Sequence, residues 1–341
     1  MARLDELRLL TRVARLYHES GMKQPEIAVR LRLSQPKVSR LLRQAMDLGI
    51  VRITVGVPTG AFPQLEEQLE RRFGLQEAVV VDAGGELEEQ VLRPLGAAAA
   101  YYVESTIRSG DVVGISSWSA TLLAMVDAMQ PVTSARRARV VQILGGVGSP
   151  TAESHATHLT RRFAELVRGD AVFLPAPGVV GSPEAKRVLL EDSFVDAAVD
   201  LFDQVTVALV GIGAVQPSGL LASSGNVFSQ HELDAVCELG GVGDICLRFF
   251  TATGELVETP LNDRVIGIEL EQLKRLPRAV GVAGGQRKVP AIRGALEGGW
   301  INCLITDRFA AEELLDLRPN EDGQRLSGTD FDLAGLRPAG G

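Results

Sequence analysis

The sequence predicts an α/β protein with two domains: an N-terminal winged helix-turn-helix and a larger domain built on a parallel sheet. Three observations support this prediction. The chain has 341 residues, too many for one small helical domain. Its first 57 residues are basic although the whole chain is acidic. Beyond residue 78, short continuous apolar runs alternate with segments of helical length, as in a parallel sheet covered on both faces.

The charge is unevenly distributed along the chain. Residues 1–57 contain eleven Lys/Arg and five Asp/Glu, a net charge of +6, whereas the rest contains 24 and 38, a net charge of -14. A basic segment on an acidic body is typical of a DNA-binding module joined to a domain with another role. A basic face that is merely solvated is the alternative.

Residues 24–43 (QPEIAVRLRLSQPKVSRLLR) have the pattern of two short helices joined by a tight turn. Ser34 is placed to cap the second helix, and Pro36 lies in its first turn, where a missing backbone donor costs little. One face of that helix is apolar at i, i+3, i+4 and i+7, through Val38, Leu41, Leu42 and Ala45. The opposite face is polar and basic. We therefore expect DNA contacts from Gln24, Ser34, Gln35, Lys37, Ser39, Arg40 and Arg43.

The flanking segments complete this module. A first helix is expected over residues 7–20, and residues 51–55 alternate as a short strand, which as a wing would bring Arg52 to the DNA backbone. The turn-rich segment 56–63 is a linker. We expect domains at 1–57 and 58–318 and a disordered polar tail at 319–341. A charged amphipathic helix containing Leu65, Leu69 and Phe73 begins the second domain and packs on it or on a second subunit.

The second domain is expected to contain eight strands with helices between them. The strands are predicted at 78–81, 112–115, 140–144, 172–174, 205–209, 265–268, 280–283 and 301–306. Helices are predicted at 96–109, 121–129, 157–167 and 288–296. The stretch 244–258 breaks the alternation and predicts an antiparallel hairpin that turns near Thr253-Gly254.

Small and hydroxyl residues follow several of these strands, where ligands bind in open α/β sheets. Glycines after a strand often only make a tight turn, but here several strand ends converge. Backbone N–H groups in such loops can approach an anion, and basic side chains can neutralise a phosphate. The sequence therefore predicts a sugar-phosphate pocket formed by Ser116, Trp118, Ser119, Ala120, Thr121, Gly145, Gly146, Gly211, Gly213, Asp244, Gln286, Arg287 and Lys288. For Asp244 a turn-capping role, and for Trp118 a core role, are equally compatible with the pattern.

Other kinds of site are not predicted. The Gly-x-Gly segments at 146, 211 and 241 lack the third glycine of a dinucleotide fingerprint, and there is no Walker A sequence. His155 and His158 have no companion ligands for a metal. The three cysteines form no paired motif and are expected to be buried and reduced. We therefore expect no cofactor, metal or catalytic residue, and a cytoplasmic protein without a signal peptide or membrane span.

Several longer stretches resemble the SorC/DeoR family of bacterial sugar-responsive transcription regulators, from about Leu7 to Leu315. They are LSQPKVSRLL (33–42), GISSWSATL (114–122), LPAPGVVGSPEAKRVLL (174–190), GGVGDICLRFF (240–250) and GGQRKVPAIRGALEGGWINCLITD (284–307). The resemblance implies a second domain with the fold of ribose-5-phosphate isomerase and glucosamine-6-phosphate deaminase. It also implies that residues 119–121 form a phosphate loop and that Asp244 and Lys288 line an effector pocket. The family usually has Gly and a hydroxyl or Arg where Ser119 and Ala120 stand.

These observations lead us to expect a repressor of a carbohydrate-metabolism operon. It would bind operator DNA as a homo-oligomer, a dimer or tetramer, and respond to a phosphorylated sugar. Two alternatives stay open. One is an isomerase or deaminase of sugar phosphates, and the other is a regulator whose vestigial pocket has given way to sensing of a protein partner.

Overall fold

A computed structural model describes residues 2–51, 60–85, 87–116, 118–132, 137–146, 150–216 and 228–316. The chain forms two compact units, Met1–Pro58 and Thr59–Gly341. The expected wing with Arg52, the linker up to residue 59 and the tail from residue 319 lie outside the described residues. Among the described helices, none has a long enough apolar stretch to cross a membrane.

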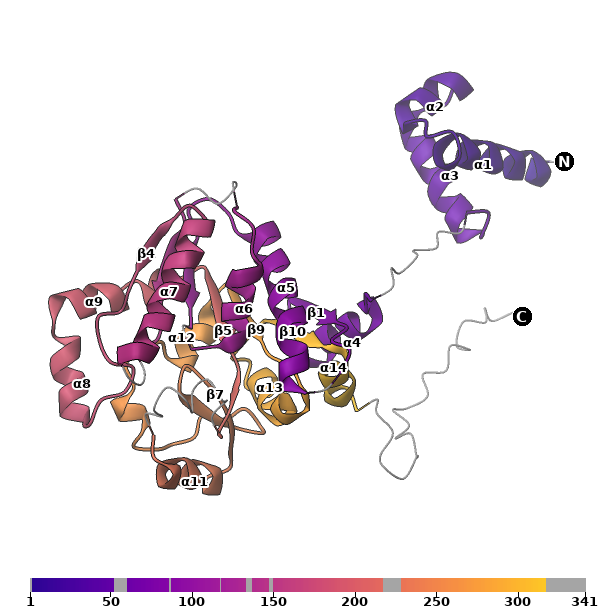
Figure 1. The fold of residues 1–341 in the computed structure, drawn as a ribbon. Coiled ribbons are helices and arrows are strands. Elements are labelled where there is room, and N and C mark those ends of the chain that lie inside the picture. The colour runs from indigo at the N-terminus through magenta and orange to yellow at the C-terminus, as the bar shows by residue number, and fades with distance from the viewer. Residues whose placement is uncertain are drawn as a thin grey trace. The chain divides into compact units, whose positions relative to one another are not determined.

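The smaller unit contains three helices, α1 (Ala2–His18), α2 (Gln24–Leu31) and α3 (Gln35–Asp47) (Figure 1). The predicted apolar stripe of α3 is confirmed, because all four of its residues are buried against α1 and α2. Between α2 and α3, Arg32 adopts a left-handed conformation (φ 53°) and the Leu33 N–H donates to Ala28 O at 2.9 Å. Ser34 occupies the N-cap position of α3, but its hydroxyl makes no capping hydrogen bond, so that part of the prediction is wrong.

The larger unit is built on a seven-stranded sheet in which all the pairings are parallel. The strand order is β1-β10-β9-β5-β2-β3-β4. The strands are β1 (Glu77–Val81), β2 (Val112–Ile115), β3 (Arg139–Gln142), β4 (Asp170–Val172), β5 (Val207–Gly211), β9 (Arg278–Val282) and β10 (Cys303–Asp307). The predicted strand at 265–268 is wrong. That apolar segment is buried, but it makes only isolated bridges, from Val265 to Val179 and from Gly267 to Leu144.

Helices cover both faces of this sheet (Figure 1). One apolar core joins the sheet to α5 (Glu88–Thr106), α6 (Ala120–Ala128) and α7 (Pro150–Leu166), through residues such as Leu95, Met125 and Phe163. The other core joins it to α4 (Pro63–Phe73), α12 (Leu270–Arg275), α13 (Val289–Glu297) and α14 (Arg308–Leu314). The larger unit also contains α8 (Pro183–Leu190), α9 (Ser193–Val199) and α11 (Gln230–Glu238). The predicted amphipathic helix is α4, whose Leu69 is fully buried in this unit.

A small antiparallel sheet lies outside the large one, with strand order β6-β7-β8. Its strands are β6 (Gly213–Ala214), β7 (Gly241–Ile245) and β8 (Arg248–Thr251). The hairpin was predicted to turn near Thr253-Gly254, but it turns at Cys246 and Leu247, which have φ of 53° and 62°. Thr253 and Gly254 form the next turn, beyond β8, where Phe250 bridges to Leu256.

The cysteines also differ in part from expectation. All three are free, and Cys246 and Cys303 are buried as predicted. Cys237 is exposed, because it lies on the outer side of α11, whose buried side chains are Leu233 and Val236.

Candidate effector pocket and DNA-contacting helix

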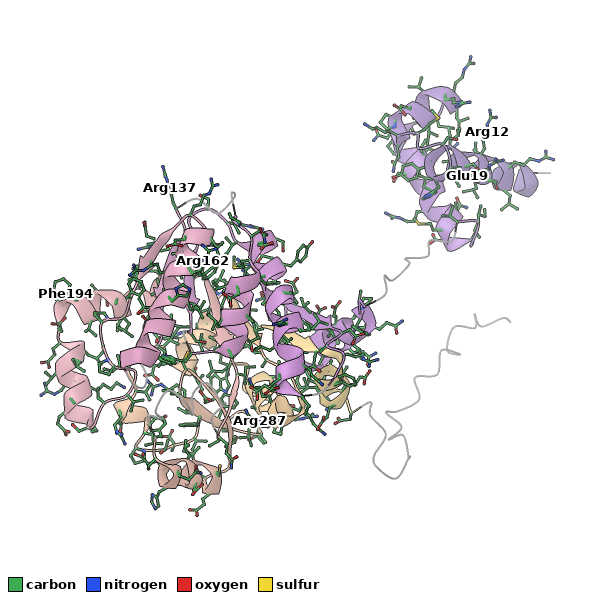
Figure 2. All side chains as sticks on the ribbon, in the orientation of Figure 1. Arg12, Glu19, Arg137, Arg162, Phe194 and Arg287 are labelled. Carbon is green, nitrogen blue, oxygen red and sulfur yellow. The ribbon has the colours of Figure 1, made fainter. Side chains whose placement is uncertain are left out.

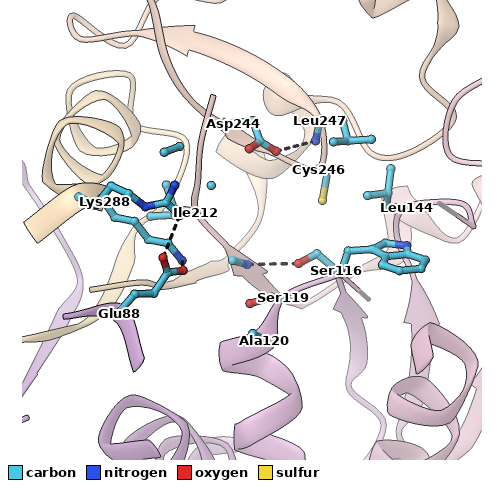
Figure 3. Close-up of a pocket in the computed structure, with 15 residues that line it drawn as sticks. Glu88, Ser116, Ser119, Ala120, Leu144, Ile212, Asp244, Cys246, Leu247 and Lys288 are labelled. Carbon is cyan, nitrogen blue, oxygen red and sulfur yellow. Dashed lines mark hydrogen bonds and ion pairs between the residues drawn. The ribbon is translucent and has the colours of Figure 1, made fainter. Parts of the chain in front are cut away.

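A pocket opens at the carboxyl ends of β2, β5 and β9, where the strand-end rule places ligands (Figure 3). About 690 Å³ of empty space lies between its walls, part of it open to solvent. It is lined by Glu88, Ser116, Trp118, Ser119, Ala120, Leu144, Gly211, Ile212, Gly213, Ala214, Asp244, Cys246, Leu247, Arg287 and Lys288. These residues come from six separate stretches of the chain, which the parallel sheet and the β7–β8 hairpin bring together.

The loops after β2 and β5 are fastened to each other. The Gly211 N–H donates to Ser116 Oγ at 3.2 Å, and the Ser116 N–H donates to Leu209 O at 3.0 Å. Ser119 caps α6 by accepting the Leu122 N–H at 3.3 Å. A Cβ atom at position 211 would collide with the Ser119 hydroxyl, so glycine is required there for the two loops to approach.

Asp244 lies in the pocket wall and also shapes the hairpin turn. Its Oδ2 accepts the Leu247 N–H at 3.0 Å, and a Cβ at Gly213 would collide with its other oxygen. Burial raises the pKa of Asp244 from 3.8 to about 6, against the opposing effects of the Leu247 N–H and the Lys288 charge. Asp244 therefore caps a turn, which was one of the two roles left open by the sequence, and it also lines the pocket.

The cationic side of the pocket is formed by Arg287, which is labelled in Figure 2, and Lys288. Both follow β9 and precede α13. Both contact Glu88 in the first turn of α5. Lys288 Nζ lies 3.0 Å from Glu88 Oε1, and Arg287 Nη2 lies 2.8 Å from Glu88 Oε2. Burial acts to raise the pKa of Glu88, but Lys288 and Arg287 outweigh it and hold that pKa below its ordinary value. Glu88 is therefore ionised at neutral pH.

The remaining wall is largely apolar and includes Trp118, Leu144, Ile212 and Leu247. The Trp118 indole packs against the core, which was one of its two expected roles, while its edge also lines the pocket. Its Nε1 atom is buried and has no hydrogen-bond partner within the described part of the chain. The pocket thus combines an apolar wall, one carboxyl group and an ion-paired basic pair.

In the smaller unit, the polar face of α3 is exposed. Gln35, Lys37, Ser39, Arg40 and Arg43 are all exposed there, as is Ser34 just before the helix. Gln24 is half-buried at the start of α2. This exposed face has three basic side chains and one acidic residue, Asp47, at the end of the helix, so its chemistry suits contacts with phosphates and base edges.

Residues 58–316 match the Sugar-bind family of sugar-binding domains. The deoxyribonucleoside regulator of Bacillus subtilis (strain 168) is 35% identical over 312 residues, which cover 92% of this chain and 98% of that protein. The sorbitol operon regulator of Klebsiella pneumoniae is 32% identical over 317 residues, covering 92% of this chain and all of that protein. This chain belongs to the SorC/DeoR family. The full-length crystal structure of that Klebsiella regulator, SorC, matches with a TM-score of 0.69, covering 91% of this chain and 98% of the other.

This SorC/DeoR-family chain is thus a transcriptional regulator with a sugar-binding domain. Nine of the thirteen predicted pocket residues line its pocket, and four do not: Thr121, Gly145, Gly146 and Gln286. Thr121 is buried in the first turn of α6, and Gln286 is exposed. The Gly145 N–H donates to Ile266 O, and the Gly146 N–H donates to Ala176 O. These glycines pack closely against neighbouring backbone, and a Cβ on Gly145 would collide with it.

Two other acidic residues at strand ends, Asp82 after β1 and Asp307 at the end of β10, have structural roles. Asp82 accepts the Gly84 N–H in a turn. Asp307 is fully buried, accepts the Gly285 N–H at 2.7 Å and caps α14 through the Ala310 N–H at 3.0 Å. It therefore positions the loop that carries Arg287 and Lys288 without reaching the pocket. Within the described residues, no cluster of three or more His, Cys, Asp or Glu could hold a metal ion.

The pocket residues that sequence reasoning missed are Glu88, Leu144, Ile212, Ala214, Cys246 and Leu247. Glu88 is the important omission, since it contacts both basic side chains. The available signal was a pair of acids at residues 88–89 at the start of a helix, but their partners lie about 200 residues away in the sequence.

Proposed function

We propose that this chain represses a carbohydrate-metabolism operon and releases its operator DNA when a phosphorylated sugar binds the pocket. The observation that carries the proposal is that Arg287, Lys288 and Asp244 all line one pocket of a sugar-binding domain. Relatives named as regulators of the sorbitol operon, of deoxyribonucleosides and of erythritol catabolism support the choice of a sugar or sugar derivative.

The proposed ligand contacts follow from the chemistry of the lining. Arg287 and Lys288 would hold the phosphate, because charge-assisted bonds from a guanidinium and an ammonium suit its oxygens. Asp244 and Ser116 would bond sugar hydroxyls, and the Trp118 indole would contact a sugar face.

The proposed DNA contacts are those of α3, together with Gln24, Ser34 and the wing residue Arg52. We place the domain boundary at residues 57–58 and propose a homo-oligomer, a dimer or tetramer, acting in the cytoplasm. A symmetric dimer would read two half-sites about 34 Å apart, or a multiple of that distance.

We propose that the pocket senses its ligand without converting it. Asp244 has a pKa near neutrality, as a general base needs, but the other carboxylate of the lining, Glu88, is committed to two cations. An isomerase or deaminase would require a second acid–base group free to act on the opposite side of the substrate. Turnover of ribose 5-phosphate or glucosamine 6-phosphate by the purified protein would contradict this part of the proposal.

The deciding experiment is a melting screen against free sugars, monophosphates and bisphosphates. Both tryptophans, Trp118 and Trp300, lie in the larger unit, so intrinsic fluorescence reports the melting of that unit alone. One phosphorylated sugar should raise the melting temperature, because a ligand that binds the native state stabilises it. Lys288→Ala should abolish the shift, and Lys37→Ala, which removes the same charge from α3, should not.

Three results would count against the proposal. If only unphosphorylated sugars raise the melting temperature, the effector does not need a phosphate, and that part of the proposal is wrong. A shift that survives in Lys288→Ala would contradict the assigned subsite. No shift with any compound would favour a regulator that senses a protein partner through a vestigial pocket.

A further inference from the structure

The basic residues expected to hold an effector's phosphate are ion-paired with another side chain of the same chain. The Glu88 carboxylate contacts Lys288 through Oε1 and Arg287 through Oε2, at 3.0 and 2.8 Å (Figure 3). One anion with two oxygens thus bridges two cations, as an oxygen pair of a phosphate would. Arg287 has one further contact, from its Nη1 to Gln216 O at 3.3 Å.

Burial explains why an internal anion is needed at this position. The Lys288 side chain is only 13% exposed, so its ammonium group has lost most of its hydration. A cation in that position is unfavourable unless an anion accompanies it. Glu88 supplies that anion: its carboxylate compensates the charge of the buried Lys288 ammonium group and so stabilises the folded pocket.

The Glu88 carboxylate can also move away from the two cations. Its side chain is 35% exposed and belongs to the first turn of α5, so the carboxylate can turn toward solvent by a change of rotamer. A phosphate monoester carries roughly -1.5 to -2 charge and three strong acceptor oxygens, against one charge and two oxygens for a carboxylate. A phosphate group can therefore replace Glu88 at the two cations, at the cost of breaking its two ion pairs.

We propose that Glu88 is an internal competitor: its carboxylate fills the anion subsite formed by Arg287 and Lys288 until the phosphate of an effector displaces it. This inference rests on the proposed function, since it concerns the same pocket. The consequence is a lower affinity of the subsite for every anion, because each must displace the Glu88 ion pairs. Only a group that binds both cations strongly then occupies the subsite at cellular concentrations.

Inorganic phosphate is a suitable probe because it tests the subsite without requiring the identity of the sugar. We would measure its dissociation constant by calorimetry on the full chain, for the wild type and for Glu88→Gln. Gln keeps the size of the side chain but removes the charge. We expect Glu88→Gln to bind phosphate at least about tenfold more tightly, equivalent to about 1.4 kcal/mol. Without phosphate, it should melt a few degrees lower, since Lys288 loses its partner.

Two variants make the measurement specific. Glu89→Gln removes the same charge one residue further along α5, from an exposed side chain, and should change phosphate affinity less than twofold. In the double variant Glu88→Gln with Lys288→Ala, the increase in phosphate affinity should disappear. If Glu88→Gln does not fold, Glu88→Asp shortens the side chain by one methylene, draws the carboxylate away from the cations and should give a smaller gain of the same sign.

The possible results separate this inference from the function on which it rests. Unchanged or weaker phosphate binding by Glu88→Gln would overturn the competitor role and make Glu88 a ligand contact. An equal gain in Glu89→Gln would overturn it too, because the effect would then be general repulsion. If a phosphorylated sugar stabilises the wild type in either case, the proposed function still stands. Absence of saturable phosphate binding in every variant, with no response to any phosphosugar, would overturn both.

Discussion

Asp244 is the residue in which fold and pocket are most directly connected. Its carboxyl group accepts the Leu247 N–H that closes the β7–β8 turn, and it lies within the space left by Gly213. Burial raises its pKa to about 6, so the charge that it presents to a ligand changes just below neutral pH. Protonated, it can donate to a sugar hydroxyl; ionised, it only accepts.

The raised pKa of Asp244 predicts a particular pH dependence of stability. Because the folded pKa of about 6 lies above the ordinary value of 3.8, the folded state binds more protons between these two values. Stability from this group is therefore greatest below about pH 4 and falls as the pH rises to about 6. A gap of this size corresponds to about 3 kcal/mol, reduced to about 2 kcal/mol because the side chain is partly exposed.

Asp244→Asn should remove that dependence. Relative to the wild type, the variant should gain about 2 kcal/mol in the free energy of unfolding of the larger unit between pH 4 and pH 7. Urea unfolding followed by tryptophan fluorescence at several pH values measures this difference. If the stability of the two proteins differs by the same amount at every pH, Asp244 does not titrate in this range.

At the scale of elements, the β7–β8 hairpin is what carries Asp244, Cys246 and Leu247 to the pocket, and Arg248 holds it in place. The Arg248 side chain is 2% exposed. Its guanidinium donates to Asn262 O at 2.7 Å and contacts Glu269 Oε1 at 2.5 Å. Burial lowers the pKa of Arg248, although the charges around it, Glu269 first, counteract this effect. The buried arginine thus ties the hairpin to the segment that follows it.

Arg248→Met should destabilise the larger unit by about 2–3 kcal/mol, because it removes the hydrogen bonds that the guanidinium donates to Asn262 O and to the buried Val265 O. The half-exposed Glu269 limits the loss. Ligand affinity should fall as well, since the hairpin loses its anchor. Arg187→Met is the matched control: its ion pair with Glu191 is exposed on both sides and should contribute less than about 0.5 kcal/mol. Equal effects of the two substitutions in urea unfolding would contradict the anchoring role.

The exposed face of α3 carries its own prediction. Arg40→Ala should weaken operator binding by about 1–3 kcal/mol if its guanidinium reads a base, without changing the melting shift caused by the effector. The control is Arg162→Ala, which removes an exposed arginine from α7 of the larger unit (Figure 2). Fluorescence anisotropy with labelled operator DNA measures both. A loss of the same size in Arg162→Ala would show that net charge, and not the α3 face, determines affinity.

These elements show what the sequence could predict. The stripe from Val38 to Ala45 and the continuous apolar strands are local, so their periodicity predicted α3 and most of the parallel sheet correctly. The turn at Cys246–Leu247 could not be predicted this way, since two non-glycine residues with positive φ are held there by Asp244, while Gly254 gave the stronger local turn signal. Residues 265–268 are apolar because they are buried, not because they pair along a strand.

The pocket was predictable to a similar extent. The strand-end rule located Ser116, Gly211 and Lys288, because Ser116 directly follows β2, Gly211 ends β5 and Lys288 lies in the segment between β9 and α13. It could not find Glu88, whose role depends on a contact between the first turn of α5 and a loop about 200 residues later. Nor could it separate Gly211, which lets two pocket loops approach, from Gly145, which only allows close backbone packing.

At the scale of the whole molecule, the proposed function requires that the pocket and α3 influence each other. The chain divides into two compact units, with the pocket in one and the basic helix face in the other. An effector that lowers operator affinity must favour one arrangement of the assembly over another. By thermodynamic linkage, operator DNA must then lower effector affinity by the same factor.

This reciprocity gives the final prediction. Once a phosphorylated sugar is identified, saturating amounts should weaken operator binding by about 5–150-fold, the usual range for allosteric coupling. Operator DNA in excess should weaken binding of that sugar by the same factor. Arg40→Ala should lower DNA affinity with and without the sugar and leave the coupling factor unchanged. Anisotropy titrations with and without the sugar, and calorimetry with and without operator DNA, provide the two factors. Operator affinity that does not change at saturating sugar would show that the pocket does not control α3, even if the sugar binds tightly.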